Sequence, residues 1–191
     1  MKPLFVLDLE TTGLAGTEEG DKILEIGVAR VDLLAGEVHP EFSHVVHQFL
    51  TPQEKTCWAF QNTSLTVNEV KESPWSLHMC LDLLNMFTNV INGVFTSYNV
   101  AFDFDLFLKP LGFRPKMAPC IKVECGDYYN GGKWFKAQEA YNLLCPDNPA
   151  GVPDGIEEHR ALSDAVLESW ILLRYLEDNP EAKQRYLGCL Q

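Results

Sequence analysis

The sequence has few of the features of an exported or membrane protein. Its first ten residues carry a single basic side chain, Lys2, and the apolar run that begins at Leu4 is interrupted by Asp8. Such a segment makes a poor signal peptide. No run approaches the ~20 apolar residues that a membrane helix needs. We therefore expect no membrane partner and, by default, a cytoplasmic location.

Paired cysteine motifs are also missing. None of the six cysteines forms a Cys-x-x-Cys pair, which argues against a structural zinc site. A disulfide framework is typical of small secreted chains, and this chain has no secretory signal. We interpret the cysteines as reduced, small hydrophobic residues.

Basic residues are scarce. The 191 residues contain 15 Lys and Arg against 27 Asp and Glu, so the formal net charge is −12. General nucleic-acid binding relies on basic side chains at phosphates, so this charge argues mildly against that class. We find no internal repeat, low-complexity tract or linker, and the length suits one domain spanning residues 1–191.

The hydrophobic pattern predicts an α/β fold. Apolar and alternating stretches predict strands, and Gly-containing segments separate the first two. Apolar residues at helical spacing predict helices, one of which Pro110 should end. The predicted strands are residues 4–9, 21–32, 44–50 and 93–99, with a short strand near Ile121, and the predicted helices are 76–91, 101–110, 137–144 and 160–179. Residues 112–133 otherwise read as loop, as do 147–155. We expect a mixed five-stranded sheet, with its first three strands antiparallel, flanked by helices.

Acidic residues interrupt the first strand. In the stretch Leu-Asp-Leu-Glu, Asp8 and Glu10 project from the same face, about 6.6 Å apart along the strand. Two neighbouring carboxylates repel each other unless protons or cations neutralise them. Carboxylate oxygens are ligands that suit Mg²⁺ or Mn²⁺. Alone, the pair would be read as a polar strand end.

Two later motifs add acids and a histidine. Tyr-Asn-Val-Ala-Phe-Asp, residues 98–103, follows a strand and brings Asp103, with Asp105 as the competing acid. The spacing after Asn99 favours Asp103, and two residues on a helix point about 200° apart, so both cannot serve. His-Arg-Ala-Leu-Ser-Asp, residues 159–164, places His159 before a helix and Asp164 inside it. Ala161, Asp164, Ala165 and Glu168 share a stripe of that helix, which lets it approach a sheet closely.

Together these motifs resemble the DEDD 3′→5′ exonucleases, in the His-containing branch that includes the epsilon proofreading subunit, RNase T and oligoribonuclease. Residues 6–14 resemble the first motif of that family, residues 98–107 the second, and residues 159–165 the third. The resemblance extends over about residues 3–175. It implies an RNase H-like fold and hydrolysis of a terminal phosphodiester of single-stranded DNA or RNA, releasing nucleoside 5′-monophosphates.

The resemblance also implies roles for individual residues. Asp8, Glu10, Asp103 and Asp164 match the four acids that hold two divalent metal ions, Mg²⁺ or Mn²⁺. His159 matches the histidine that accepts a proton from the attacking water. The nucleotide contacts that the family implies fall on Thr11, Thr12, Gly13, Leu14, Tyr98 and Asn99. Tyr98 stands where many relatives have His, and Ser64 replaces a Gly in a segment that contacts the terminal nucleotide in relatives.

Several alternatives stay open. The same fold could serve as a non-catalytic module that binds nucleic acid or a polymerase, although none of its acids is missing here. A homodimer is possible because some relatives form one, and nothing points to a polymerase partner. Glu25 is read either as structural or as a residue that supports the metal ligands. We read Lys122, Lys133 and Lys136 as solvated surface, and Trp134 as the best of the four tryptophans for stacking on a base.

Overall fold

The computed structural model describes residues 1–152 and 159–191. A mixed five-stranded sheet forms its centre, in the order β3-β2-β1-β4-β5. β1 pairs antiparallel with β2, as β2 does with β3, whereas β4 runs parallel to β1 and β5 parallel to β4. The strands are β1 Leu4–Thr11, β2 Ile23–Asp32, β3 Glu37–Val45, β4 Val94–Thr96 and β5 Lys116–Met117. The expected α/β fold, with its first three strands antiparallel, is confirmed.

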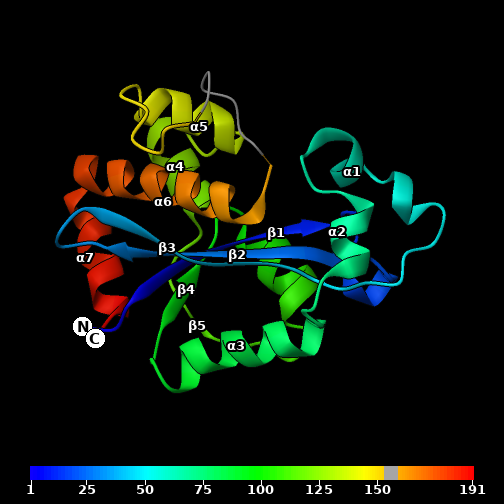
Figure 1. The fold of residues 1–191 in the computed structure, drawn as a ribbon. Helices are drawn as coiled ribbons and strands as arrows, with labels where there is room; N and C mark the ends of the chain where they lie inside the picture. Colours follow the sequence, from blue (N-terminus) through cyan, green and yellow to red (C-terminus); the bar gives the residue numbers. More distant parts are fainter. Residues whose placement is uncertain (153–158) are drawn as a thin grey trace.

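Helices cover both faces of this sheet (Figure 1). The face that carries Leu4 and Val6 packs against α4, α5, α6 and α7, and the face that carries Phe5 and Leu7 packs against α3 and the π-helix η3. The helices are α1 Trp58–Asn62, α2 Val67–Glu72, α3 Leu77–Asn89, η3 Ala101–Leu108, α4 Ile121–Tyr129, α5 Ala137–Leu144, α6 Ala161–Asp178 and α7 Pro180–Cys189, with short 3₁₀ turns η1 Thr17–Glu19 and η2 Glu54–Thr56. Alternation along β1 thus places Asp8 and Glu10 on the α6 face.

Local signals explain several helix ends. Ser76 Oγ accepts a hydrogen bond from the backbone N–H of Met79 at the start of α3, and Thr66 with Glu69 forms a capping box on α2. Asn179 caps α7, which has Pro180 in its first turn. No helix among the described residues is both long and apolar enough to cross a membrane.

The third strand lies earlier than we expected. β3 is Glu37–Val45 rather than residues 44–50. The prediction missed it because Pro40 reads as a strand breaker, yet β3 is an edge strand and Pro40 sits beside an irregularity in its pairing with β2. Beyond β3, Val46 still donates its N–H to the carbonyl of Leu24 (2.7 Å).

The segment 112–133 also differs from the expectation. The short strand is Lys116–Met117, not near Ile121, and Ile121 begins the helix α4. This helix has a β-branched residue and a glycine in its interior, which lower helix propensity. It forms because Ile121 and Cys125 are buried in the core beside α6. The predicted loop 147–155 lies partly outside the described residues, and α7 was not predicted.

Candidate active site

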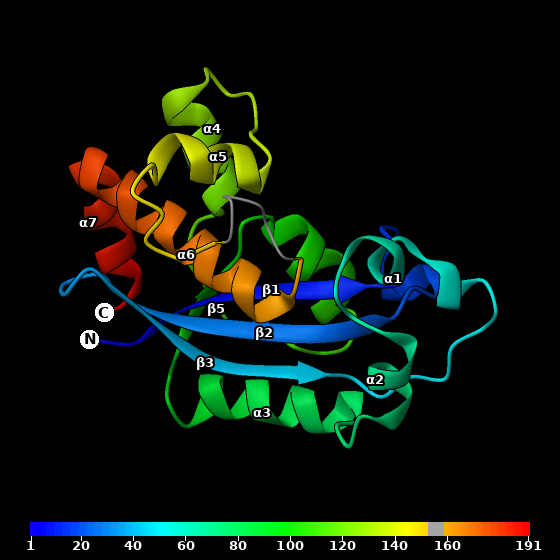
Figure 2. The ribbon, with the colours of Figure 1, turned by 45° about the horizontal axis from the view of Figure 1, so that its top comes forward.

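Asp164 comes close to the two acids of β1 because α6 lies directly on the sheet. Asp8 of β1 pairs with Gly27 of β2. A Cβ atom at Gly27 would overlap the carbonyl carbon of Ala161, the first residue of α6. The absence of a side chain at Gly27 therefore lets the start of α6 rest on the backbone of β2, which brings Asp164 toward β1. Figure 2 shows α6 crossing β1 and β2 at this point.

Three carboxylates meet there. One oxygen from each of Asp8, Glu10 and Asp164 lies within 4.8 Å of the others. Glu10 and Asp164 are 7% and 4% exposed, and Asp8 is partly buried. The expectation that Asp8 and Glu10 project together, and that Asp164 joins them, agrees with these positions.

The fourth acid comes from the π-helix. Asp103 is 2% exposed, and its buried Oδ1 has no hydrogen-bond partner among the residues that the structure describes. Asp105, the competing acid, is exposed and pairs with Lys109 (3.5 Å). The carbonyl of Asn99 accepts the N–H groups of Phe102 and Asp103 (2.8 and 3.1 Å), which fixes the start of the turn. Irregular helical turns of this kind often occur at functional sites.

A fifth acid joins the cluster. Glu168 is 4% exposed and accepts the backbone N–H of Tyr98 (3.2 Å). After burial itself, the Glu168 charge is the main influence that raises the pKa of Asp8. The stripe of α6 named in the sequence analysis includes Glu168, because it lies four residues after Asp164 on the same face. The family motif has no position for it, so it was not predicted as a site residue.

The electrostatics of this cluster favour bound protons or cations. Burial, together with the charges of Glu168, Asp103, Asp164 and Glu10, raises the pKa of Asp8 well above its ordinary value. Burial also raises the pKa of Asp103 to about 7, with the Ser97 hydroxyl and the Lys122 charge acting in the opposite direction. Crowded, desolvated carboxylates need protons or cations to balance them. Oxygen donors in such a set, including the unpartnered Oδ1 of Asp103, fit hard divalent ions such as Mg²⁺ and Mn²⁺.

His159 stands at the rim of the acidic cluster. Its Nδ1 is 3.8 Å from Oδ2 of Asp164, and its ring packs edge-on against Trp58 with centroids 5.1 Å apart. The side chain is 35% exposed. The backbone of His159 has φ = 50°, a left-handed conformation that is uncommon for residues other than glycine and often marks functional sites.

A buried ion pair anchors the residue that follows. Arg160 donates from Nε and Nη2 to the two carboxylate oxygens of Glu25 (2.8 and 2.9 Å), and the Glu25 side chain is 1% exposed. Glu25 also accepts from Ser43 Oγ (2.9 Å) and the N–H of Ala161 (3.3 Å). Glu25 thus holds the start of α6 on the sheet, in agreement with the structural role expected for it.

A cavity of about 420 Å³ opens over these groups. Thr11 Oγ1 donates to the carbonyl of Gly13 (2.7 Å), and Thr12 Oγ1 accepts the N–H of Lys22 (2.9 Å), so the turn after β1 is well fixed. Leu14 at its edge is 80% exposed. The lining residues are Asp8, Leu9, Glu10, Thr11, Thr12, Gly13, Leu14, Trp58, Phe102, His159 and Asp164.

Two predicted contact residues do not line this cavity. Tyr98 is 6% exposed and donates its hydroxyl to the carbonyl of Phe135 (3.0 Å). Asn99 uses its carbonyl to begin the π-helix. Trp58 was considered only as one of four tryptophans that could stack on a base, and Phe102 was not predicted; both line the cavity beside the acids because distant segments pack together.

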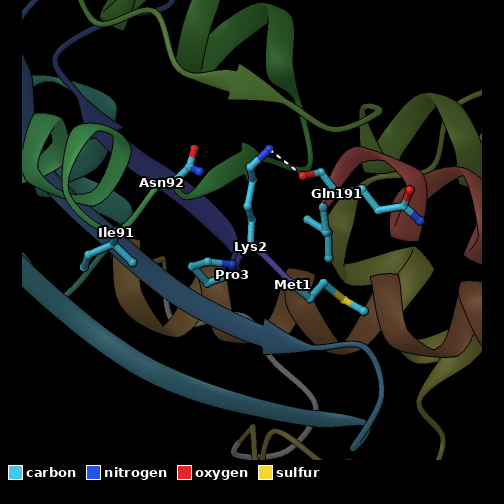
Figure 3. Close-up of a pocket in the computed structure, with 7 residues that line it drawn as sticks. Met1, Lys2, Pro3, Ile91, Asn92 and Gln191 are labelled. Carbon is cyan, nitrogen blue, oxygen red and sulfur yellow. Dashed lines mark hydrogen bonds between the residues drawn. The ribbon is translucent and has the colours of Figure 1, made fainter.

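A second hollow lies at the other end of β1, beside both termini, and has a volume of about 600 Å³ (Figure 3). Lys2 there donates to the carbonyl oxygen of Gln191 (2.8 Å). Among the described residues that line it, Lys2 has the one charged side chain. It therefore lacks the acids and the histidine that make the first cavity chemically distinctive.

Neither a protein-family model nor a curated protein matches the sequence. Several solved structures match the fold of this chain. Exonuclease X in complex with 5′-overhanging duplex DNA aligns over 98% of this chain and 99% of its own, with a TM-score of 0.65 and 21% identity. The nuclease domain of 3′hExo, described as a DEDDh family member bound to rAMP, aligns over 93% of each chain with a TM-score of 0.65 and 16% identity.

Exonuclease I of E. coli, solved with a dA16 oligonucleotide, aligns over 96% of this chain and 42% of its own, with a TM-score of 0.68 and 14% identity. At these identities the comparison concerns the fold. The fold implied by the resemblance of the three motifs is confirmed: the chain has the fold of these exonucleases.

Proposed function

We propose that this chain is a metal-dependent 3′→5′ exonuclease that hydrolyses the terminal phosphodiester of single-stranded DNA or RNA and releases nucleoside 5′-monophosphates. The observation that carries the proposal is the convergence of Asp8, Glu10 and Asp164 within 4.8 Å at the floor of a cavity whose lining includes His159. Residues 1–191 act as a single exonuclease domain in this proposal.

Asp8, Glu10, Asp103 and Asp164 would hold two divalent ions, Mg²⁺ or Mn²⁺, with Asp8, Glu10 and Asp164 as the converging set. When bound, such ions stabilise negative charge on the attacking and leaving oxygens of a phosphodiester. Burial raises the pKa values of Asp8 and Asp103, and the charges of the neighbouring acids raise that of Asp8 further; bound cations would relieve both effects.

The chain's own groups supply the proton transfer and the positioning. His159 takes the proton of the attacking water, and its partly exposed imidazole can pass that proton to solvent. Thr11, Thr12 and Gly13 form the turn against which the terminal nucleotide lies. Leu14 and Trp58 offer exposed apolar surface to its base. Tyr98 and Asn99 contribute by supporting the turn that carries Asp103.

The net charge of −12 constrains the substrate. An acidic protein gains little from counterion release on a duplex. A single-stranded end held by ions and by base stacking fits this surface better. We propose that substrate class for both DNA and RNA.

The alternative is a non-catalytic binding module on the same fold. Loss of one or more acids would be expected of such a module, whereas all four acids and His159 are present in the sequence. Asp8, Glu10, Asp164 and His159 line one cavity, and the charge of Asp103 acts on Asp8. This arrangement favours the enzyme.

The test is degradation of 5′-labelled single-stranded DNA and RNA with Mg²⁺, Mn²⁺ or EDTA. We expect a ladder that shortens from the 3′ end, is absent with EDTA and falls by roughly 100-fold or more in Asp103→Asn. Asp105→Asn is the matched control, because that acid is exposed two residues away. If neither substrate shortens with either ion, or if both variants retain wild-type activity, the proposal is wrong.

A further inference from the structure

A tryptophan and a lysine form a platform beside the acidic cluster. Nζ of Lys122 lies over the Trp134 ring, 4.4 Å from its centroid, yet Trp134 is 64% exposed. Gly126 lies one turn after Lys122 on α4. A Cβ there would be 2.9 Å from the carbonyl oxygen of Lys133 and 3.2 Å from Cδ1 of Trp134. The segment that carries Trp134 therefore packs closely on α4, which orders an exposed aromatic ring.

Tyr98 connects this platform to the acids. Its N–H donates to Glu168 (3.2 Å), and its carbonyl accepts the N–H of Lys122 (2.9 Å). Its hydroxyl donates to the carbonyl of Phe135, next to Trp134 (3.0 Å). One buried residue thus contacts the acidic cluster and both halves of the platform, so their relative position is fixed.

The segments that form the platform are also rich in lysine. Lys122, Lys133 and Lys136 lie within 15 residues of a chain that has only 15 Lys and Arg in total. Lys133 and Lys136 are exposed. Of the acids in the same segments, Glu124 accepts from Tyr175 and Arg185, Glu139 accepts the N–H of Lys136, and Asp127 lies beside Gly132. An exposed aromatic ring among lysines is typical of surfaces that bind single-stranded nucleic acid.

We propose that Trp134 and Lys122, with Lys133 and Lys136, form a subsite for the part of a single strand that lies on the 5′ side of the scissile bond. One base stacks on the open face of the Trp134 indole, and the lysine ammonium groups contact the neighbouring phosphates. This proposal rests on the proposed exonuclease function. Figures 1 and 2 show α4 and α5 on one side of the start of α6 and α1 on the other, so a strand that ends beside Trp58 can continue over α4.

The test compares two substrates that differ in whether they have an upstream strand. One is a 5′-labelled single-stranded 12-mer. The other is the 4-nitrophenyl ester of thymidine 5′-monophosphate, which has a terminal nucleotide and a leaving group only. We expect Trp134→Ala to raise KM for the 12-mer about tenfold, with kcat and the hydrolysis of the ester unchanged. Trp134→Phe, which keeps a ring, should recover most of the loss.

Binding without turnover provides a second measurement. In EDTA, the fluorescence anisotropy of a labelled 12-mer gives Kd as a function of salt. The triple variant Lys122→Gln, Lys133→Gln, Lys136→Gln should lower the slope of log K against log[salt] by about 2, since each phosphate contact on a single strand contributes roughly 0.7. Lys109→Gln, directly after η3 on the opposite face of the sheet from α4, is the control and should leave the slope unchanged.

The outcomes separate the two proposals. If wild type hydrolyses both substrates and Trp134→Ala affects them equally, the subsite is wrong and the exonuclease stands. If the lysine variant binds with the wild-type salt slope, the subsite is likewise wrong. If wild type hydrolyses neither substrate but the variants lose affinity for the 12-mer as described, the exonuclease is wrong and the surface still binds single strands.

Discussion

The ion pair between Arg160 and Glu25 allows a sharp prediction about stability. Replacing Arg160 with Ala would leave the Glu25 carboxylate, which is 1% exposed, with only Ser43 Oγ and the Ala161 N–H as donors. Removing one partner of a buried pair costs about 3–5 kcal/mol. Arg160 is 25% exposed, so water can reach part of the site. We therefore expect a loss of about 3 kcal/mol in the free energy of unfolding.

This loss converts into a measurable change in melting temperature. In a domain of this size, 1 kcal/mol corresponds to roughly 2–4 °C, so Arg160→Ala should melt roughly 6–12 °C below wild type. Circular dichroism during heating measures the change. The same variant should also lower kcat, since Arg160 follows His159 directly and fixes the start of α6.

Arg30→Ala is the matched control. Arg30 lies on β2, the strand that carries Glu25, and pairs with Glu41 at 2.7 Å, but the two side chains are 36% and 27% exposed. Surface pairs of that kind contribute under about 1 kcal/mol. A melting temperature of Arg160→Ala that equals that of Arg30→Ala would refute the reasoning that burial makes Glu25 dependent on its partner.

Three further predictions concern the acidic cluster and its support. Mg²⁺ or Mn²⁺ at about 100 times its Kd should stabilise the protein by about 2.7 kcal/mol, and EDTA should reverse this; a melting temperature indifferent to both ions would contradict the metal site. Without metal, Asp103 should contribute a fall in stability as pH rises from about 4 to 7, because the folded state keeps a proton on this residue, whose pKa is about 7, that the unfolded state has released. Unfolding in EDTA across this range measures the slope, which Asp103→Asn should flatten. Gly27→Ala should cost about 1–3 kcal/mol or more in urea unfolding, because its Cβ overlaps Ala161, whereas Gly188→Ala, where a Cβ meets no atom within 4 Å, should be neutral or stabilising.

Much of the sheet was predictable because its signals are local. β1 and β2 follow directly from apolar runs and alternation, and α6 from helical spacing that places small residues along one stripe. β3 was misplaced because the acceptability of Pro40 depends on its lying at a sheet edge. α4 was missed because packing of Ile121 and Cys125 in the core outweighs a weak intrinsic helix preference.

The site residues were likewise predictable where their signals are local, and not where they depend on packing. Sequence motifs identified the candidate site residues, since their chemistry depends on residue type and short spacing. They are Asp8, Glu10, Asp103, His159 and Asp164. The choice of Asp103 over Asp105 had only spacing behind it until burial separated the two. Their positions as nucleotide contacts or metal ligands stay predictions until the assays above are made.

By itself, the sequence determined the α/β class, the strand that carries the first two acids and the order of the motifs along the chain. The tertiary structure alone determined which other residues they contact. It added Glu168 to the cluster, joined Arg160 to Glu25 across 135 residues and placed Trp134 under Lys122 beside the acids. The physical reason is that burial, charge and contact depend on which distant segments pack together, and Gly27 permits that packing only because α6 lies against its bare backbone.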